Sequence, residues 1–224
     1  MRKLVFFIAA IASTLAIPAW SAVIIEQYGD STTLGLTYNG TTYVAATPSA
    51  PDTLYTDLNG RFGGGSVVVY NKGVSSSCAK DLLNGTGSTQ PFSTVMQTSP
   101  AHVVTLNYGM NDGYYCNQTP DQYQSTMTQL VNIAKARGKI VILEEPNPTT
   151  NPQNPNLYSY IERLSQVAIS TNVPIIQHYR VMSSSNFWKL MLSDGIHPTS
   201  EGYTFKGRLE FQVISNIIQP LIPH

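Results

Sequence analysis

The sequence predicts one α/β domain in which helices cover both faces of a parallel β-sheet. Five short runs of apolar and β-branched residues have the length of strands, with little alternation between polar and apolar positions. Strands that are buried on both faces have this pattern. Helical patterns lie between the later runs, and a strand–helix–strand order produces parallel strands with helices on the sheet faces. The 224 residues suffice for one well-buried core and are few for two domains.

The strands are expected at five places along the chain. All five runs are four to five residues long, which suits a strand better than a helix. They are Val23 to Gln27, Ser66 to Tyr70, His102 to Leu106, Lys139 to Leu143 and Pro174 to Gln177.

Three helices are expected in the second half of the chain. The first begins with the capping box Thr119-Pro120-Asp121-Gln122 and stops at Gly138. The second opens at Pro155, and the third runs from about Ser200 to Ile218. The residues expected to face the core are Met127, Leu130, Val131 and Ala134 in the first, Leu157, Ile161, Leu164 and Ala168 in the second, and Phe205, Leu209, Val213 and Ile217 in the third.

The stretch between the first two strands is less regular. The residues Tyr38-Asn39-Gly40-Thr41 indicate a two-residue β-hairpin, followed by a loop with one short helix between Pro48 and Arg61. Gly63-Gly64-Gly65 leads into the second strand. A phosphate cradle would need these glycines after a strand and at the start of a helix, so we favour a flexible connection.

The first residues have the pattern of a secretory signal peptide. Met-Arg-Lys precedes an apolar run from Leu4 to Ile17, and cleavage is expected after Ser21 or Ala22. A retained membrane anchor is the alternative, but the run is shorter than the roughly 20 residues that span a bilayer. We therefore expect a signal peptide over residues 1–22, one domain over residues 23–224, no stable membrane anchor after cleavage, and a periplasmic or secreted location where disulfides can form.

The charge composition excludes several classes of partner. Thirteen Lys and Arg balance thirteen Asp and Glu, and charged residues make up 12% of the chain, about half the usual share. Neutral hydrogen-bonding side chains must therefore cover much of the surface. Because no net field would gather a phosphate backbone or anionic lipid, we expect no nucleic acid partner.

Two segments carry residues that suit nucleophilic catalysis. Gly29-Asp30-Ser31 follows the first strand, and a glycine there permits a sharp turn that would lift the Ser31 hydroxyl into a cleft at the carboxyl ends of the strands. Taken alone, this is a common turn sequence. Near the end of the chain, Asp194 stands three residues before His197, on a loop that Pro198 keeps out of helical geometry. A carboxylate so placed can hold the imidazole tautomer that accepts a proton.

Four blocks together resemble the SGNH hydrolases, also called GDSL esterases and lipases. They are Gly29 to Ser31, Gly73, Gly109 to Asn111, and Asp194 to His197, and the resemblance runs from about Val23 to the end. The helix ending in Gln219-Pro220-Leu221 looks like the thioesterase I branch. One departure is Thr32, where the family has an apolar residue, but the mechanism does not need that side chain.

The resemblance implies a fold, a mechanism and site residues. The fold would be the flavodoxin-like three-layer α/β/α sandwich with a five-stranded parallel sheet, in which the strand bearing the serine lies between the second and third. Ser31 would attack, His197 would be the base, and Asp194 would orient it. The backbone N–H groups of Ser31 and Gly73 and the side-chain amide of Asn111 would form the oxyanion hole. No metal or organic cofactor is implied.

Other groups that could carry chemistry are set aside. His178 is the one rival base, and no pair of histidines has metal-ligand spacing. Glu144 and Glu145 are neighbours in a strand and point to opposite faces, so they cannot flank one glycosidic bond, and a salt-bridging or capping role is expected. Asp30 and Asp112 are expected to accept hydrogen bonds from backbone amides in their turns.

The two cysteines are expected to form a Cys78–Cys116 disulfide, with two free thiols as the alternative. Each lies five residues beyond a block residue, Gly73 or Asn111, in the loops that leave the second and third strands. In the implied fold these strands flank the one that bears the serine, so they are about 9 to 10 Å apart. Short loops can close that gap.

The expected activity is hydrolysis of carboxylic esters, with short acyl groups on a carbohydrate as the first candidate substrate and a lipid or thioester as the second. Tyrosines and amides in the Tyr38–Tyr43 hairpin, in Tyr114-Tyr115 and between Pro146 and Asn156 are expected to rim the cleft and suit a sugar ring. An acyltransferase that uses the same acyl-enzyme remains open. A binding module without catalysis also remains, although the presence of all four blocks argues against it.

Overall fold

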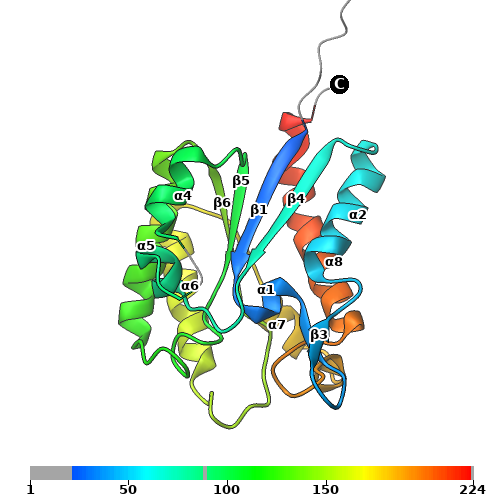
Figure 1. Cartoon of the computed structure of the whole chain (residues 1–224), viewed down its shortest axis with the longest axis vertical. Coiled ribbons are helices and arrows are strands. Elements are labelled where there is room, and N and C mark those ends of the chain that lie inside the picture. The colour runs from blue at the N-terminus through cyan, green and yellow to red at the C-terminus, as the bar shows by residue number, and fades with distance from the viewer. Residues whose placement is uncertain (1–21, 88–89, 223–224) are drawn as a thin grey trace, which may run out of the picture.

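A five-stranded parallel sheet forms the centre of the molecule, as the sequence predicts (Figure 1). The computed structural model describes residues 22–87 and 90–222, so the expected signal peptide lies outside the described residues except for Ala22. Among the described residues, none of the helices combines the length and apolar character needed to span a bilayer.

All five predicted strands form within a few residues of their expected bounds. Their spatial order is β4-β1-β5-β6-β7, so β1 lies between β4 and β5, and every pairing in this sheet is parallel. The strands are β1 (Val23–Gly29), β4 (Val67–Gly73), β5 (Val103–Asn107), β6 (Ile140–Glu144) and β7 (Ile175–Ile176). Because all strands run the same way, their carboxyl ends meet at one edge of the sheet, near α1 at the lower end of Figure 1.

Helices cover both faces of the sheet. On one face pack α3 (Ala79–Asn84), α4 (Phe92–Thr98), α5 (Pro120–Ala136) and α6 (Leu157–Thr171), and on the other pack α2 (Ala50–Phe62) and α8 (Ser200–Ile218) (Figure 1). Burial on both faces explains why polar and apolar residues do not alternate along β5. Val104 and Leu106 belong to the first of these two cores and Val103 to the second, and all three are fully buried.

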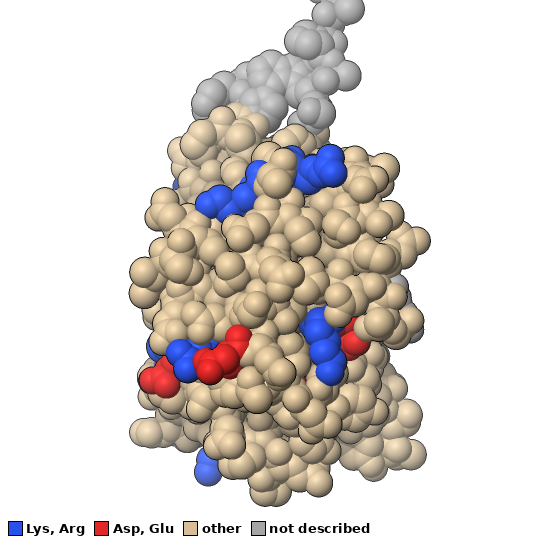
Figure 2. All heavy atoms as spheres, turned by 90° about the vertical axis from the view of Figure 1, so that its left-hand side faces the viewer, with Lys and Arg blue, Asp and Glu red and all other residues tan. Residues whose placement is uncertain are grey.

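The surface over helices α4 to α6 is mostly uncharged. Figure 2 shows that face, where a few Lys, Arg, Asp and Glu side chains lie among many neutral ones. This distribution agrees with the low charged fraction of the sequence, 12%.

Helix α5 confirms its prediction in detail. The Thr119 side chain accepts from the Gln122 N–H while the Gln122 side chain accepts from the Thr119 N–H, so the capping box is complete. The four residues predicted to face inward are all fully buried: Met127, Leu130, Val131 and Ala134.

Three local predictions need correction. The stretch expected to be a loop with one short helix is the thirteen-residue helix α2, which starts at a capping box of Ser49 and Asp52. Helix α6 begins at Leu157 and not at Pro155. The hairpin of β2 (Leu36–Tyr38) and β3 (Tyr43–Ala45) pairs Tyr38 with Tyr43, so its connection has four residues instead of two. The Asn39 side chain accepts from the N–H groups of Thr41 and Thr42 and stabilises this longer turn.

The buried face of α8 is also offset by about one residue from the prediction. Leu209, Val213 and Ile217 pack against the core as predicted but, like Phe205, are only partly buried. The fully buried positions are Tyr203, Lys206, Glu210, Ile214 and Ile218. An apolar pattern cannot show this face, because a lysine and a glutamate occupy two turns of it.

Most of the remaining short elements surround the carboxyl edge of the sheet. They are the helix α1 (Ser31–Leu34), the helix α7 (His178–Ser183) and the 3-10 helix η1 (Trp188–Met191). A second 3-10 helix, η2 (Gln219–Leu221), follows α8 at the opposite end of the sheet, near the start of β1 (Figure 1).

Candidate active site

Ser31 is placed by a tight turn at the end of β1. Asp30 caps helix α1, where its carboxylate accepts from the Thr32 N–H at 2.7 Å, and Ser31 is the first residue of that helix. A Cβ on Gly29 would lie 2.0 Å from Thr33 Oγ1 and 2.7 Å from the Asn107 carbonyl oxygen. Only glycine therefore allows α1 to fold back so closely, and the turn holds the Ser31 hydroxyl at the carboxyl edge of the sheet.

The structure brings Asp194 and His197 to this hydroxyl. Ser31 Oγ lies 2.9 Å from His197 Nε2, although the two residues are 166 positions apart in the chain. His197 Nδ1 lies 2.8 Å from Asp194 Oδ2. The loop that carries both is closed by the Ser193 N–H, which donates to the His197 carbonyl at 2.8 Å. The three side chains thus form one continuous hydrogen-bonded chain.

The Asp194 carboxylate is held in its charged form. Burial by itself would raise its pKa, but hydrogen bonds from the His197 N–H, the His197 ring and the Ile196 N–H outweigh burial and bring the pKa below its ordinary value. An ionised Asp194 fixes the proton of the neutral imidazole on Nδ1. Nε2 is then free to accept a proton from Ser31.

A pocket of about 250 Å³ opens beside Ser31 and His197. Its lining is mostly polar or aromatic, with two aliphatic residues. Besides Ser31 and His197, the lining residues are Leu36, Tyr43, Ser75, Ser76, Asn111, Tyr115 and Ile196.

Gly73, which was expected to supply an oxyanion donor, does not face this pocket. Its N–H donates to Asn71 Oδ1 at 3.0 Å, while the Asn71 amide donates to the carbonyl groups of Thr33 and Leu34. A Cβ on Gly73 would lie 2.2 Å from the Leu34 nitrogen. The glycine is therefore required where the end of β4 passes against α1. Its N–H is not directed at the pocket, so the oxyanion donor expected here would have to come from another residue.

Ser76, three residues further along the same loop, does line the pocket. It has a left-handed φ of 63°, which is rare for a residue other than glycine. Within the part of the chain that the structure describes, neither the Ser31 N–H nor the Ser76 N–H donates to a protein acceptor. Ser76 could not be recognised from the sequence, because a serine, unlike a glycine, does not mark a position of positive φ.

Asn111 lines the pocket from the loop after β5. One hydrogen of its amide is donated to the Ser77 carbonyl at 3.0 Å, which fixes the side chain and leaves a second hydrogen for a ligand. The buried Asp112 beside it accepts from the N–H groups of Ala79 and Gly109 at 2.9 and 2.8 Å, as expected for a turn aspartate. Burial raises the pKa of Asp112 to about 7, although these two N–H groups oppose the shift.

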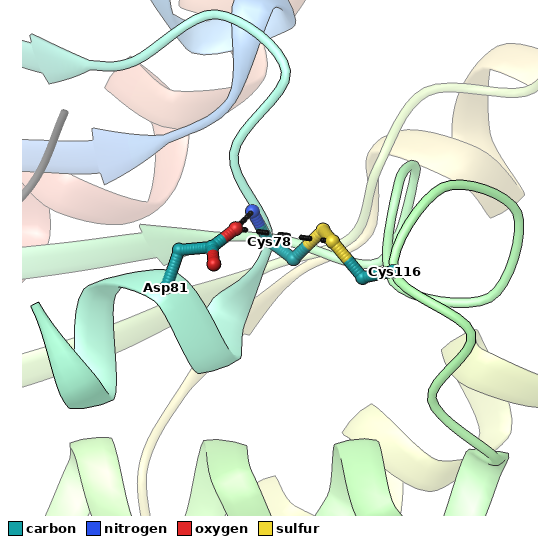
Figure 3. Close-up of side chains that lie close together, drawn as sticks. All are labelled: Cys78, Asp81 and Cys116. Atoms are coloured by element: carbon teal, nitrogen blue, oxygen red, sulfur yellow. Dashed lines mark hydrogen bonds between the residues drawn. A yellow bond between two sulfur atoms is a disulfide. The ribbon is translucent and has the colours of Figure 1, made fainter. Parts of the chain in front are cut away.

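The two loops are also joined covalently. Cys78 and Cys116 form the predicted disulfide, with a Cα–Cα distance of 6.6 Å (Figure 3). Asp81 lies beside it and accepts from the Cys78 N–H at the start of α3. The bond therefore connects the loop that carries Ser76 to the loop that carries Asn111 and Tyr115.

The segment from Pro146 to Asn156 supports the catalytic loop and does not line the pocket. Asn147 Nδ2 donates to the Ile196 carbonyl at 2.8 Å, and Thr149 Oγ1 donates to the Gly195 carbonyl at 2.6 Å. Of the three segments expected to rim the cleft, the hairpin and Tyr114-Tyr115 contribute lining residues.

The rival base and the two glutamates lie elsewhere. His178 is fully buried at the start of α7, where burial lowers its pKa well below the ordinary value, so it is separated from the pocket. Glu145 forms an ion pair with Arg180, which confirms the expected structural role. Glu144 accepts from Gln27 Nε2 within the buried interior between the sheet and α8.

Two groups of side chains among the described residues have the proximity that metal ligands need. The first contains Cys78, Asp81 and Cys116, but its cysteines are joined in the disulfide. The second contains Glu144, His178 and Glu210, all buried. Lys206 lies among them: burial lowers the pKa of its ammonium, while the neighbouring Glu210 and Glu144 oppose that shift.

The sheet order, the tight turn after β1 and the hydrogen-bonded Ser31–His197–Asp194 chain are together typical of α/β hydrolases. The model of the GDSL-like lipase/acylhydrolase family matches residues 28–205. The chain belongs to this family, and its membership supports ester hydrolase activity.

Solved structures show the same fold at low sequence identity. A lipase/acylhydrolase from Enterococcus faecalis is 20% identical with a TM-score of 0.69, over 90% of this chain and 97% of that one. The acetylxylan esterase Axe2 from Geobacillus stearothermophilus is 18% identical with a TM-score of 0.67, over 86% and 95%. An aryl esterase from M. smegmatis is 18% identical with a TM-score of 0.67, over 90% and 100%. No match was found among curated protein sequences.

Proposed function

We propose that this chain is an exported serine esterase that removes short acyl groups, such as acetyl, from a carbohydrate. The observation that carries the proposed chemistry is the hydrogen-bonded chain from Ser31 through His197 to Asp194 at the edge of a pocket. A serine hydroxyl is a weak nucleophile at neutral pH unless an oriented base accepts its proton. This chain of contacts supplies that base.

The reaction would proceed through an acyl-enzyme. Ser31 Oγ attacks the ester carbonyl while its proton moves to His197 Nε2, and the imidazolium then protonates the leaving alcohol. Water deprotonated by His197 attacks the acyl-enzyme, and the acid leaves as Ser31 regains its proton. No metal or organic cofactor takes part in these steps.

The developing oxyanion needs donors on the opposite side of the carbonyl from His197. We assign this role to the Ser31 N–H, the Ser76 N–H and the free hydrogen of Asn111 Nδ2, because all three residues line the pocket. Preorganised donors of this kind are each worth about 3 to 4 kcal/mol in the transition state. The left-handed backbone at Ser76 is a cost that such a role would offset.

The size and lining of the pocket support a short acyl group on a polar alcohol. Leu36 and Ile196 are its only aliphatic lining residues, whereas Tyr43 and Tyr115 offer aromatic faces with hydroxyl groups. Sugar rings need stacking and hydrogen bonding together, and tyrosine supplies both. The structural similarity to an acetylxylan esterase and an aryl esterase is consistent with this substrate class.

A series of p-nitrophenyl esters from acetyl to palmitoyl, followed by acetylated oligosaccharides, tests the substrate. We expect kcat/KM to be greatest for acetyl or propionyl. A steady rise beyond about eight carbons, at the increment of about 0.8 kcal/mol for each buried methylene, would instead assign a lipid or thioester substrate. New ester formed on an added acceptor alcohol would identify an acyltransferase.

Substitutions of the hydrogen-bonded chain test the mechanism. Ser31→Ala and His197→Ala should each lower ester turnover by orders of magnitude, and Asp194→Asn should be severe because it selects the wrong tautomer. Ser184→Ala is a matched control, since this exposed serine of the described surface lies outside the pocket. Substantial activity in Ser31→Ala would refute the proposed nucleophile.

Export is a separate part of the proposal. The basic and apolar leader supports it, and a disulfide is compatible with an oxidising compartment. Mass spectrometry of the protein expressed from the full-length gene in its source cell should find a mature N-terminus after Ser21 or Ala22. An intact N-terminus in the cell interior would contradict export.

A further inference from the structure

The Asp194 carboxylate has a fourth hydrogen-bond partner that comes from a distant part of the chain. Its Oδ1 accepts from the N–H groups of Ile196 and His197, at 2.9 and 2.7 Å, and its Oδ2 accepts from the His197 ring. The same Oδ2 also accepts from the Tyr43 hydroxyl at 3.0 Å, across 151 positions of sequence. One oxygen is therefore shared between the imidazole and a phenol.

The hairpin that carries Tyr43 is fastened to the catalytic loop independently of this contact. The Tyr38 N–H donates to Ser193 Oγ at 3.0 Å, and Ser193 Oγ donates in turn to the His197 carbonyl at 3.0 Å. Two residues earlier on the same strand, the Leu36 carbonyl accepts from the hydroxyl of the buried Tyr203 of α8 at 2.6 Å. These bonds hold β2, and β2 pairs Tyr38 with Tyr43 of β3, so the position of the Tyr43 hydroxyl does not depend on its bond to Asp194 alone.

The ring of Tyr43 also contacts the imidazole. Its centroid lies 5.0 Å from that of the His197 ring, with an angle of 61° between the planes. The Asp194 and His197 side chains lie on a surface loop and are only 14% and 12% exposed. Tyr43, which is itself 52% exposed, supplies part of the cover that keeps water from the His–Asp pair.

We propose that Tyr43 is a positioning residue of the catalytic centre, which holds the Asp194 carboxylate and the His197 ring in the geometry that activates Ser31. This inference rests on the proposed function, because it assigns Tyr43 a role through Asp194 and His197. Asp194 has two backbone donors on Oδ1, which hold that oxygen. The Tyr43 hydroxyl fixes the second oxygen and with it the plane of the carboxylate relative to the imidazole.

The shared oxygen has a consequence for the hydrogen bond between Asp194 and His197. A phenol that donates to Oδ2 stabilises the carboxylate charge and so weakens the attraction of Asp194 for the Nδ1 proton of the imidazole. In return, the bond to Asp194 raises the pKa of the Tyr43 hydroxyl, which keeps it protonated and donating. Removing the hydroxyl should therefore change the hydrogen bond that the His197 Nδ1 proton makes with Oδ2.

The other titratable groups around this centre stay unchanged in such an experiment. Asp30 beneath the nucleophile interacts with His197, and Tyr203 on α8 interacts with Asp194. Asp194 itself contacts the His197 ring, and Tyr38 of the same hairpin interacts with Tyr43. A change confined to Tyr43 can thus be attributed to that residue.

The test compares Tyr43→Phe with Tyr38→Phe in the full-length protein. Tyr43→Phe keeps the ring and removes one donor to Asp194. Tyr38→Phe removes a hydroxyl from the same hairpin that donates only to the Gly40 carbonyl, and Tyr38 is not among the pocket-lining residues. For each variant, kcat and KM on p-nitrophenyl acetate are measured across pH, together with the NMR resonance of the His197 Nδ1 proton and the melting temperature.

We expect Tyr43→Phe to lower kcat about three- to tenfold, the effect of losing one hydrogen bond of typical net strength at a half-exposed side chain. KM should change little, and the resonance of the His197 Nδ1 proton should shift. Tyr38→Phe should match the wild type in all of these.

A lower kcat with an unmoved Nδ1 resonance would make Tyr43 a pocket wall only and overturn the proposal, as would wild-type behaviour. Ser31→Ala is assayed in parallel, so that failure of the Tyr43 proposal can be distinguished from failure of the proposed function. If Ser31→Ala is inactive and Tyr43→Phe is normal, only the role of Tyr43 fails. If Ser31→Ala is active, the proposed function itself fails.

Discussion

Removing the Cys78–Cys116 disulfide measures how much this bond, which joins the two loops beside Ser31, stabilises the folded protein. The change is the double substitution Cys78→Ala/Cys116→Ala, which leaves no thiol in the described residues. The bond closes a loop with a sequence separation of 38. By the chain-entropy relation, releasing a loop of this length lowers the free energy of unfolding by about 4 kcal/mol.

The same variant should keep most of its activity at 25 °C. Non-covalent bonds still join the two loops, since Asn111 Nδ2 donates to the Ser77 carbonyl and the Ala79 N–H donates to Asp112. We therefore expect kcat on p-nitrophenyl acetate to fall no more than about threefold. The loss should lie in stability, at roughly 2 to 4 °C of melting temperature per kcal/mol for a domain of this size, or about 8 to 16 °C.

Thermal unfolding followed by circular dichroism, with and without reductant, measures this. Reductant should lower the melting temperature of the wild type towards that of the variant and leave the variant unchanged. Cys78→Ser/Cys116→Ser serves as a second pair that separates the cross-link from the packing of Cys78, which is fully buried. A melting temperature within about 2 °C of the wild type in both double variants would refute the chain-entropy estimate.

Three further predictions concern single positions. Asn111→Ala should lower kcat about a hundredfold with little change in KM, because the amide would act on the oxyanion of the transition state. An unchanged kcat would exclude this role for Asn111. Gly73→Ala should cost about 1 to 3 kcal/mol in urea unfolding, since the new Cβ would lie 2.2 Å from the Leu34 nitrogen; an unchanged midpoint would contradict that contact. For Glu210, burial and the neighbouring Glu144 raise the pKa from 4.5 to about 8, so the folded protein retains a proton that the unfolded chain has released. Wild-type stability should therefore fall as pH rises through this window, and Glu210→Gln should flatten the decline in urea melts at about pH 5 and about pH 8; parallel declines would argue against a raised pKa.

Much of the fold follows from local patterns in the chain. Strands buried on both faces have no polar face to show, so runs such as Val103–Asn107 are recognised by length and composition alone. Helix α5 is signalled by a capping box and by inward residues three and four positions apart. These features act over a few residues, which is why the sequence reveals them.

Local patterns do not predict burial where charged or polar residues from distant parts of the chain pair with one another in the interior. Lys206 and Glu210 are buried on α8 because carboxylate, amide and ammonium groups from β1, β6 and α8 pair in the interior. In a single sequence these two residues mark a solvated face. The partners that make their burial tolerable come from other elements, so the buried face of α8 could not be predicted.

In the candidate site, too, some features follow from the sequence and others only from the tertiary structure. The sequence by itself determined that Ser31, Asn111, Asp194 and His197 would meet at one edge of the sheet, because parallel strands bring their following loops together. The tertiary structure decided which atoms face the substrate. It turned the Gly73 N–H towards Asn71, placed Ser76 at the pocket wall, and brought the Tyr43 hydroxyl to Asp194. Such choices depend on packing between elements distant in sequence, with separations up to 166 residues at the Ser31–His197 contact, and no local pattern encodes them.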